Sequence, residues 1–371
     1  MKITAVETFF VKPSWLFCKV STDEGLVGWG EPIVEGHART VATAVAELAE
    51  EIIGEDPRRI NHFWQAAYRG AFYRGGPVLT SAISGVEQAL WDINAKALGV
   101  PVYQMLGGAC RDRIRVYAHV GGQTPEEIGE SARKRLAQGF EAFKTSFFGA
   151  LRTVEPPNVL RDAAAKMAAL REAVGWEMDI AIDFHGRVSP ALAVQAAQAF
   201  EPYKPMFIEE PCLPENVDTM VTIARSTTIP VATGERLFTK WGFREVLEKQ
   251  AAVILQPDVS HCGGIFETIK IGAMAEAYYA AMAPHCPLGP IALAACLQAD
   301  AAMPNFLIQE QVSLGDDYLV TPFTIEQGCI PLSTGPGLGI EVNEEAVREG
   351  AYDGSWKTPQ LRHADGSVAD W

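Results

Sequence analysis

Three short apolar runs in the sequence each end in an acidic side chain, at Asp183, Glu209 and Glu235. The acids follow one another at intervals of 26 residues, enough for one strand, one crossover helix and two short loops. Capping of the following helix could explain any single acid, but it explains three acids in register less well. Converging carboxylates repel one another unless a cation lies between them, and oxygen ligands suit Mg²⁺. We therefore predict that Asp183, Glu209 and Glu235 bind Mg²⁺.

Two histidines follow strand-like runs of the same region. Asp258 and His285 end neighbouring strands, so the carboxylate can hydrogen-bond the imidazole and raise its basicity, which predicts a general base. His185 stands two residues after Asp183 and faces the same way if the strand continues. The third and seventh strands lie opposite each other in a ring of eight. The two histidines are therefore expected to face each other across a bound substrate, where one can take a proton and the other can give one.

Lys144 and Glu310 end two further strands, and each has two interpretations. Lys144 either binds the carboxylate of a substrate or serves as a structural ion-pair partner. Glu310 either donates a hydrogen bond to a developing enediolate, if it is protonated, or pairs with a lysine. The remaining histidines are interpreted as ordinary polar residues; they are His37, His62, His119, His261 and His363.

Strand-like runs alternate with helical patterns over residues 115–314. The runs cover residues 115–120, 142–147, 178–183, 206–209, 231–234, 253–256, 280–283 and 306–309. Eight strands joined by crossovers predict a (β/α)₈-type barrel, because closure leaves no edge strand. In such barrels the active site lies at the carboxyl ends of the strands, where the ionisable side chains described above are found.

A smaller α+β unit is predicted for residues 1–114, in which alternating apolar positions indicate two or three antiparallel strands followed by helices. The tail, residues 315–371, lacks the alternation of strands and helices that marks the barrel. Its residues 328–332 and 335–342 are interpreted as short strands. We expect the tail to pack against the N-terminal unit and to complete a capping domain over the barrel.

Composition excludes several classes of partner. The net charge of −15 disfavours nucleic acids and anionic membranes. The N-terminal residues lack the apolar core of a signal peptide, and no apolar run is long enough to span a bilayer. Seven scattered cysteines without a CxxC motif argue against disulfides or a zinc site. We expect a cytoplasmic protein with reduced thiols and a small-molecule substrate.

Five stretches resemble the mandelate racemase subgroup of the enolase superfamily, whose members use a Lys or His base with Mg²⁺. They are VGWGEP (27–32), FYRGGP (72–77), DFHGRVS (183–189), ILQPD (254–258) and APHCPLGPIALAAC (283–296). The resemblance covers essentially the whole chain and is closest to the galactonate dehydratases. It implies a modified (β/α)₇β barrel under a cap, with Mg²⁺ held by the three acids.

The same resemblance implies roles for the other residues. His285, supported by Asp258, is the base, His185 is the acid on the leaving hydroxyl, and Glu310 stabilises the enediolate. The expected reaction removes the C2 proton of a sugar acid and eliminates its 3-hydroxyl, which gives a 2-keto-3-deoxy acid; D-galactonate is the expected substrate. Such barrels are commonly homo-oligomers.

The segment after Lys144 departs from the family pattern. Racemases of the subgroup carry Lys-x-Lys at this point, whereas this chain has Lys144-Thr-Ser146, so the second lysine base is missing. Galactonate dehydratases have Asn in place of Ser146, and the loop at 147–157 is more apolar than theirs; its Phe147 and Phe148 either shape the site or pack under the cap. The alternatives are therefore a racemase, epimerase or cycloisomerase of a related acid, or a non-catalytic metal- or ligand-binding barrel.

Overall fold

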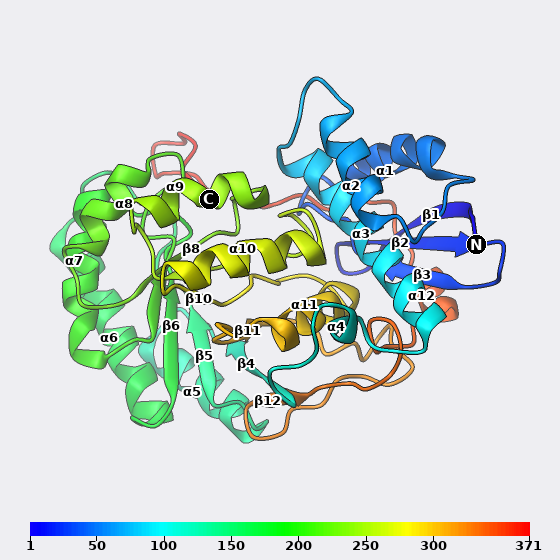
Figure 1. Cartoon of the computed structure of the whole chain (residues 1–371). Coiled ribbons are helices and arrows are strands. Elements are labelled where there is room, and N and C mark those ends of the chain that lie inside the picture. Colours follow the sequence, from blue (N-terminus) through cyan, green and yellow to red (C-terminus); the bar gives the residue numbers. More distant parts are fainter.

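A parallel barrel forms the larger part of the computed structural model, which describes all 371 residues (Figure 1). Its strands are β4 (Arg113–His119), β5 (Ala142–Thr145), β6 (Asp179–Asp183), β7 (Phe207–Glu209), β8 (Val231–Thr233), β9 (Ile254–Leu255), β10 (Ala281–Met282) and β11 (Gln309–Glu310). Neighbours along the chain pair in parallel, and β11 returns to β4. The ring closes where Met282 bridges Phe306 and its carbonyl accepts a hydrogen bond from Leu307 N at 2.7 Å. The predicted barrel is confirmed.

Seven helices connect the eight strands, and none follows the last strand before the tail begins. They are α5 (Pro125–Ala137), α6 (Pro157–Val174), α7 (Pro190–Phe200), α8 (Val217–Ala224), α9 (Thr239–Glu248), α10 (Ile265–Ala277) and α11 (Pro290–Ala302), with a short 3₁₀ turn, η1 (Glu201–Tyr203), after α7. This order is the modified (β/α)₇β form that the resemblance implies. Local sequence sets the helix starts; α5, for example, begins with a capping box in which Thr124 and Glu127 satisfy each other's backbone N–H groups.

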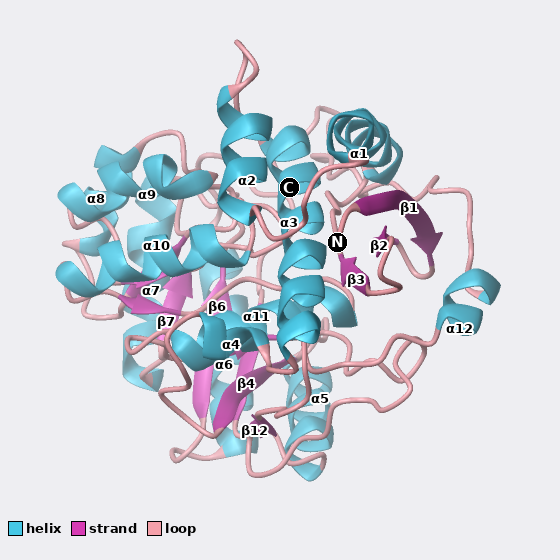
Figure 2. Cartoon of the chain, turned by 45° about the vertical axis from the view of Figure 1, so that its right-hand side comes forward, coloured by secondary structure: helices cyan, strands magenta, loops and turns pink.

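The N-terminal unit is a three-stranded antiparallel sheet packed on helices (Figure 2). The sheet consists of β1 (Ile3–Val11), β2 (Trp15–Thr22) and β3 (Val27–Gly30), and the helices are α1 (Ala38–Ile52), α2 (Ile60–Arg69), α3 (Pro77–Leu98) and α4 (Val102–Met105). Strands followed by helices are what the sequence predicts for this region. None of the helices in the chain combines the length and the apolar character needed to cross a membrane.

Helix α3 fastens the N-terminal unit to the barrel through a row of buried polar side chains. Ser84 accepts a hydrogen bond from Gly263 N at 3.0 Å. Glu87 accepts hydrogen bonds from Ile265 N and Phe266 N at 2.8 and 3.0 Å, so it caps the first turn of α10 from another part of the chain. The loop between β9 and α10 is therefore held in place by α3.

The tail contacts both parts of the molecule. Its strand β12 (Cys329–Pro331) pairs antiparallel with β4 of the barrel. After α12 (Glu344–Glu349) the chain reaches β1, where Lys12 N donates to Gly350 O at 3.0 Å and Tyr352 N donates to Phe10 O at 3.1 Å. The expected contact between the tail and the N-terminal unit is present. The domain boundaries proposed at residues 114 and 314 stay a prediction.

One predicted strand of the tail is wrong. Residues 335–342 form isolated bridges and turns rather than a strand. Gly337 and Gly339 have φ values of 73° and 76°, in the left-handed region that glycine tolerates and that a strand does not contain. The apolar residues of this stretch suggested a strand, but its glycines bend the backbone.

Replacing Glu87 by alanine tests the attachment through α3. The Glu87→Ala change leaves the N–H groups of Ile265 and Phe266 and the Trp91 indole N–H, which donates to Glu87 at 2.7 Å, without their acceptor. We expect a loss of about 2–4 kcal/mol in the free energy of unfolding, measured by urea titration. Glu47→Ala, on the exposed face of α1, is the matched control and should change stability by less than about 0.5 kcal/mol. Equal stability of the two variants would contradict the assigned role of Glu87.

Candidate active site

A layer of eight buried side chains fills the barrel below its mouth, by which we mean the carboxyl ends of β4 to β11. The layer takes one residue from each strand or from its immediate neighbourhood: Tyr117, Ala142, Ala181, Phe207, Ala232, Ile254, Ala283 and Ile308. Side chains two residues apart on a strand face the same side. The residues two positions further on therefore also point inward, and six of them are ionisable: His119, Lys144, Asp183, Glu209, His285 and Glu310.

Lys144 lies at the centre of the buried acids. Its Nζ atom is 2.9 Å from both carboxylate oxygens of Glu209, 2.8 Å from Glu310 and 3.5 Å from Asp183. Burial alone would lower the pKa of the Lys144 ammonium, but Glu209 and Glu310 outweigh it and hold the pKa well above its ordinary value. The lysine is therefore charged, and it offsets part of the repulsion among the carboxylates.

The three acids predicted as metal ligands converge. Asp183, Glu209 and Glu235 each place a carboxylate oxygen within 4.8 Å of the other two. Glu235 reaches this position because Gly234 has φ 150° and passes close to Gln256, where a Cβ atom would lie 2.8 Å from the backbone. The Oε2 atom of Glu235 is buried without a hydrogen-bond partner. This set of three carboxylates includes a buried oxygen that makes no hydrogen bond and lies 3.4 Å from His285 Nε2. Such a set fits a hard divalent cation such as Mg²⁺.

His285 and Asp258 form the expected hydrogen bond, with 2.8 Å between Nδ1 and Oδ2. The second carboxylate oxygen of Asp258 accepts from Ser260 N at 2.7 Å, which fixes the acid in the loop that α3 holds. The Nε2 atom of His285 faces the mouth, 3.4 Å from Glu235. Burial lowers the pKa of His285, but Glu235, Glu310 and Asp258 together raise it well above its ordinary value.

His185 also reaches the mouth, but not for the predicted reason. Strand β6 ends at Asp183, and His185 adopts φ 52° in a tight turn in which its N–H donates to Asp183 Oδ1 at 2.7 Å. The turn brings its Nε2 atom 3.2 Å from Asp183 Oδ2. Arg236 supports the turn by donating to the His185 carbonyl at 3.2 Å while it pairs with Glu210. Burial and the nearby Arg187 lower the pKa of His185 to about 3.

Glu310 is in the ion-paired arrangement rather than the protonated one. Its carboxylate lies 2.8 Å from Lys144 Nζ and 2.7 Å from His119 Nε2, and it accepts from Cys286 N at 2.9 Å. Burial raises the pKa of Glu310, but Lys144 and His285 outweigh it and hold the pKa well below its ordinary value. The structure thus favours the second of the two interpretations of Glu310, while its role toward an enediolate stays a prediction.

Two histidines interpreted above as ordinary polar residues, His119 and His261, also line the mouth. His119 follows the buried Tyr117 by two residues, so the same period-two argument that applies to Lys144 could have identified it. His261 lies in the loop after β9, where its Nδ1 is 3.0 Å from Ser81 Oγ and its Nε2 is 3.5 Å from Glu35. No regular spacing marks His261, because its position depends on contacts with the N-terminal unit.

A pocket opens between the mouth, the N-terminal unit and the tail. Lys144, Asp183, His185, Glu235, His285 and Glu310 line it from the barrel, Ser14, Val34, Glu35 and Pro77 from the N-terminal unit, and Trp356, Thr358, Pro359 and Trp371 from the tail. Phe147 and Phe148 do not pack under the N-terminal unit: their rings lie 5.6 and 5.1 Å from those of Phe200 and Phe184. They belong to the packing of the barrel against α7.

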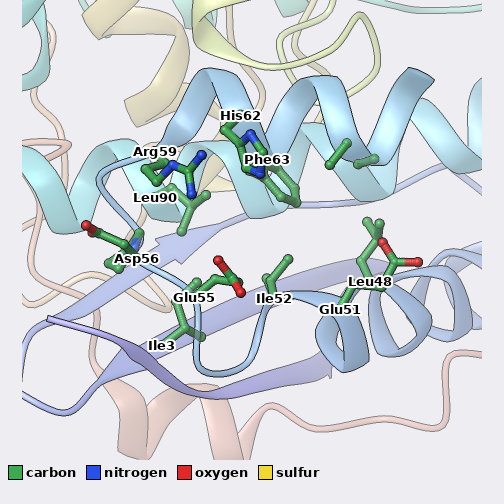
Figure 3. Close-up of a pocket in the computed structure, with 13 residues that line it drawn as sticks. Ile3, Leu48, Glu51, Ile52, Glu55, Asp56, Arg59, His62, Phe63 and Leu90 are labelled. Atoms are coloured by element: carbon green, nitrogen blue, oxygen red, sulfur yellow. The ribbon is translucent and has the colours of Figure 1, made fainter. Parts of the chain in front are cut away.

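A second pocket lies in the N-terminal unit, between α1 and α2 (Figure 3). Ile3, Ile52, Phe63 and Leu90 form its apolar lining, and acidic side chains such as Glu51 stand at its edge. It contains none of the ionisable side chains of the barrel mouth. The mouth of the barrel is therefore the candidate active site.

Comparisons with known proteins agree with this geometry. Residues 3–107 match the family model of the mandelate racemase / muconate lactonizing enzyme N-terminal domain, and residues 127–346 match the enolase C-terminal domain-like model. The chain is 49% identical to a D-galactonate dehydratase of Variovorax paradoxus and 48% identical to one of Ralstonia pickettii, in each case over all of both chains.

Solved structures show the same likeness. An enolase from Agrobacterium radiobacter with bound Na and L-malate is 33% identical, with a TM-score of 0.92 over all of both chains. A mandelate racemase/muconate lactonizing enzyme from Jannaschia sp. is 33% identical, with a TM-score of 0.90 over 95% of this chain and 98% of the other. The barrel has an acidic mouth and is covered by an α+β unit, in agreement with these full-length matches. This chain therefore belongs to the mandelate racemase / muconate lactonizing enzyme family of the enolase superfamily.

Proposed function

We propose that this chain is a Mg²⁺-dependent sugar-acid dehydratase. It removes the C2 proton of an aldonate, D-galactonate foremost, and eliminates the 3-hydroxyl to give a 2-keto-3-deoxy acid. The observation that carries the proposal is that His185 and His285 follow β6 and β10, which lie opposite each other in the ring. Each imidazole lies beside a member of the three-carboxylate cluster: His185 Nε2 is 3.2 Å from Asp183 and His285 Nε2 is 3.4 Å from Glu235. Full-length relatives named D-galactonate dehydratase support the choice of substrate.

Asp183, Glu209 and Glu235 would hold the ion. A bound Mg²⁺ supplies positive charge close to the substrate carboxylate, which stabilises the negative charge that develops there when the proton leaves C2. Lys144, whose ammonium lies among the same carboxylates, would contact the substrate carboxylate as well. Glu310 keeps Lys144 in position, since it holds Nζ at 2.8 Å.

His285 is the base in this proposal. Its Nδ1 atom is engaged by Asp258, so Nε2 is the atom that faces the mouth and accepts the C2 proton when the ring is neutral. A cation held by Glu235 would favour that neutral form, because it would offset the carboxylate charge that raises the pKa of His285. Asp258 stabilises the imidazolium that forms and fixes the ring in one orientation. The loop that carries Asp258 is held by α3, so the base is built on a rigid support.

His185 is the acid. It transfers a proton to the 3-hydroxyl as the C3–O bond breaks, and water leaves. The electron pair left when His285 took the C2 proton, held until then on the substrate carboxylate, forms the C2–C3 double bond. The resulting enol takes a proton at C3 and becomes the 2-keto acid. In the structure burial favours neutral His185; an anionic substrate beside the ring favours the imidazolium that the acid role requires.

The segment after Lys144 distinguishes this proposal from a racemase. A racemase needs a second base on the opposite face of the substrate carbon, and the position that carries the second lysine in subgroup racemases is Ser146 here. The Ser146 hydroxyl is buried without a hydrogen-bond partner, and a serine alcohol is a poor base at neutral pH. Elimination assisted by His185 therefore agrees better with the residues present.

The reaction class is tested by incubating the protein with five- and six-carbon aldonates and aldarates, with Mg²⁺ and with EDTA. We expect 2-keto acid to form from D-galactonate only when the metal ion is present, because the carboxylate cluster alone cannot offset the developing negative charge. A product with the mass of the substrate would select a racemase or epimerase. The absence of any reaction would favour a non-catalytic binding protein.

The division of labour between the histidines is tested with two matched variants. In deuterated solvent we expect His285→Asn to abolish exchange of the C2 proton and keto acid formation together, each by about 10²–10⁴-fold. His185→Asn should retain C2 exchange while it loses keto acid formation, because it removes only the group that assists the leaving hydroxyl. Identical behaviour of the two variants, followed by proton NMR, would refute the assigned roles.

A further inference from the structure

The tail crosses the mouth of the barrel after it leaves the N-terminal unit, and its last residues lie beside α9 (Figure 1). Two contacts guide it over the loop before α1: Lys357 Nζ donates to Gly36 O at 3.0 Å, and Thr358 Oγ1 donates to Glu35 O at 3.3 Å. A small hairpin follows, in which Arg362 bridges Val368 and Ala369 N donates to Leu361 O at 3.0 Å. The hairpin directs Trp371 into the active-site pocket.

Trp371 packs against His185. The two ring centroids are 5.4 Å apart, and the rings are nearly perpendicular, at 85°. The guanidinium of Arg187 lies over the same indole, 5.1 Å from its centroid. Edge-to-face aromatic contacts and cation–π contacts are both attractive. The indole is therefore held from the barrel side by both a histidine and an arginine, while the residue as a whole remains 48% exposed.

The two histidines of the site are held in different ways. His285 has Asp258 on its Nδ1 atom, so a hydrogen bond fixes the ring. The Nδ1 atom of His185 is buried without any hydrogen-bond partner, and only Nε2 has a polar contact, with Asp183. A single contact at one nitrogen leaves the plane of an imidazole free to rotate about that contact. The ring of Trp371 supplies the packing that restricts it.

We infer that Trp371 is a positioning residue for His185. By packing its indole on the imidazole, it keeps His185 directed at the leaving hydroxyl, so that the tail of the chain, and not the barrel alone, completes the acid side of the site. This inference rests on the proposed dehydratase function for its catalytic consequence, but not for the contact itself. The indole of Trp371 forms its ring contact with His185, whereas His285 is fixed by Asp258, so we expect the base side of the site not to depend on Trp371.

Replacing Trp371 by alanine should separate the two half-reactions. We expect keto acid formation from D-galactonate to fall by about 10–100-fold, because a small misplacement of a catalytic group can cost that much. Exchange of the C2 proton with solvent deuterium, which depends on His285, should be almost unchanged. Trp371→Phe retains an aromatic ring against His185 and should recover most of the lost dehydration.

Trp176 offers a matched control. It too is an exposed tryptophan packed on an arginine, with the Arg171 guanidinium 5.3 Å from its ring, but it lies just before β6, at the opposite end of that strand from His185. Trp176→Ala should leave exchange and dehydration unchanged. A parallel loss of both reactions in Trp371→Ala, without recovery in Trp371→Phe, would show a merely structural role and overturn the inference, as would unchanged dehydration.

A measurement that needs no turnover keeps this inference separate from the proposed function. In NMR spectra of the protein, the ring signals of His185, assigned with His185→Asn, should shift in Trp371→Ala because the neighbouring indole is lost. The ring signals of His285 should stay in place. Unmoved His185 signals would refute the contact even if the dehydratase proposal holds, whereas shifted signals in a protein without dehydratase activity would refute the proposed function alone.

Discussion

The concentration of carboxylates around Lys144 is the constraint on which the rest of the molecule depends. Asp183, Glu209 and Glu310 surround one ammonium inside the barrel, and Glu235 lies close by. Charges of the same sign repel strongly in a buried environment, and each one costs several kcal/mol to remove from water. The single positive charge of Lys144 cannot neutralise four carboxylates. The rigid strands must therefore hold the carboxylates close together against their mutual repulsion. This is the arrangement that a divalent cation can stabilise.

The segments that support His285 differ from those that support His185. The loop with Asp258 is tied to the long helix α3, through Ser84 and Glu87, and the base side is thereby joined to the N-terminal unit. The turn with His185 is supported by Arg236 and by the tail. The ends of the barrel strands supply the converging acids, while α3 and the tail, which lie outside the barrel, add support to the surroundings of the two imidazoles. A cap of this kind can therefore influence the chemistry as well as the choice of substrate.

Much of the fold could be predicted because the same local pattern, a short apolar run that ends in a polar side chain, recurs along the sequence. Buried runs followed by an acid at a spacing of 26 residues identified the three acids whose carboxylates converge in the structure. The alternation of side chains along a strand also marks His119, which was interpreted as an ordinary polar residue. The turn at His185 and the left-handed glycines near Gly337 could not be predicted in the same way, because such backbone conformations are set by neighbours distant in the sequence. The contact of Trp371 with His185 joins residues 186 positions apart, and no local pattern indicates it.

The most direct test of the account is a crystal structure of the His185→Asn variant with Mg²⁺ and D-galactonate. The account predicts one ion bound by Asp183, Glu209 and Glu235, with C2 of the sugar acid facing His285 and its 3-hydroxyl facing position 185 on the opposite side. An ion held by other residues, or a substrate with C2 and the 3-hydroxyl both turned toward His285, would contradict it.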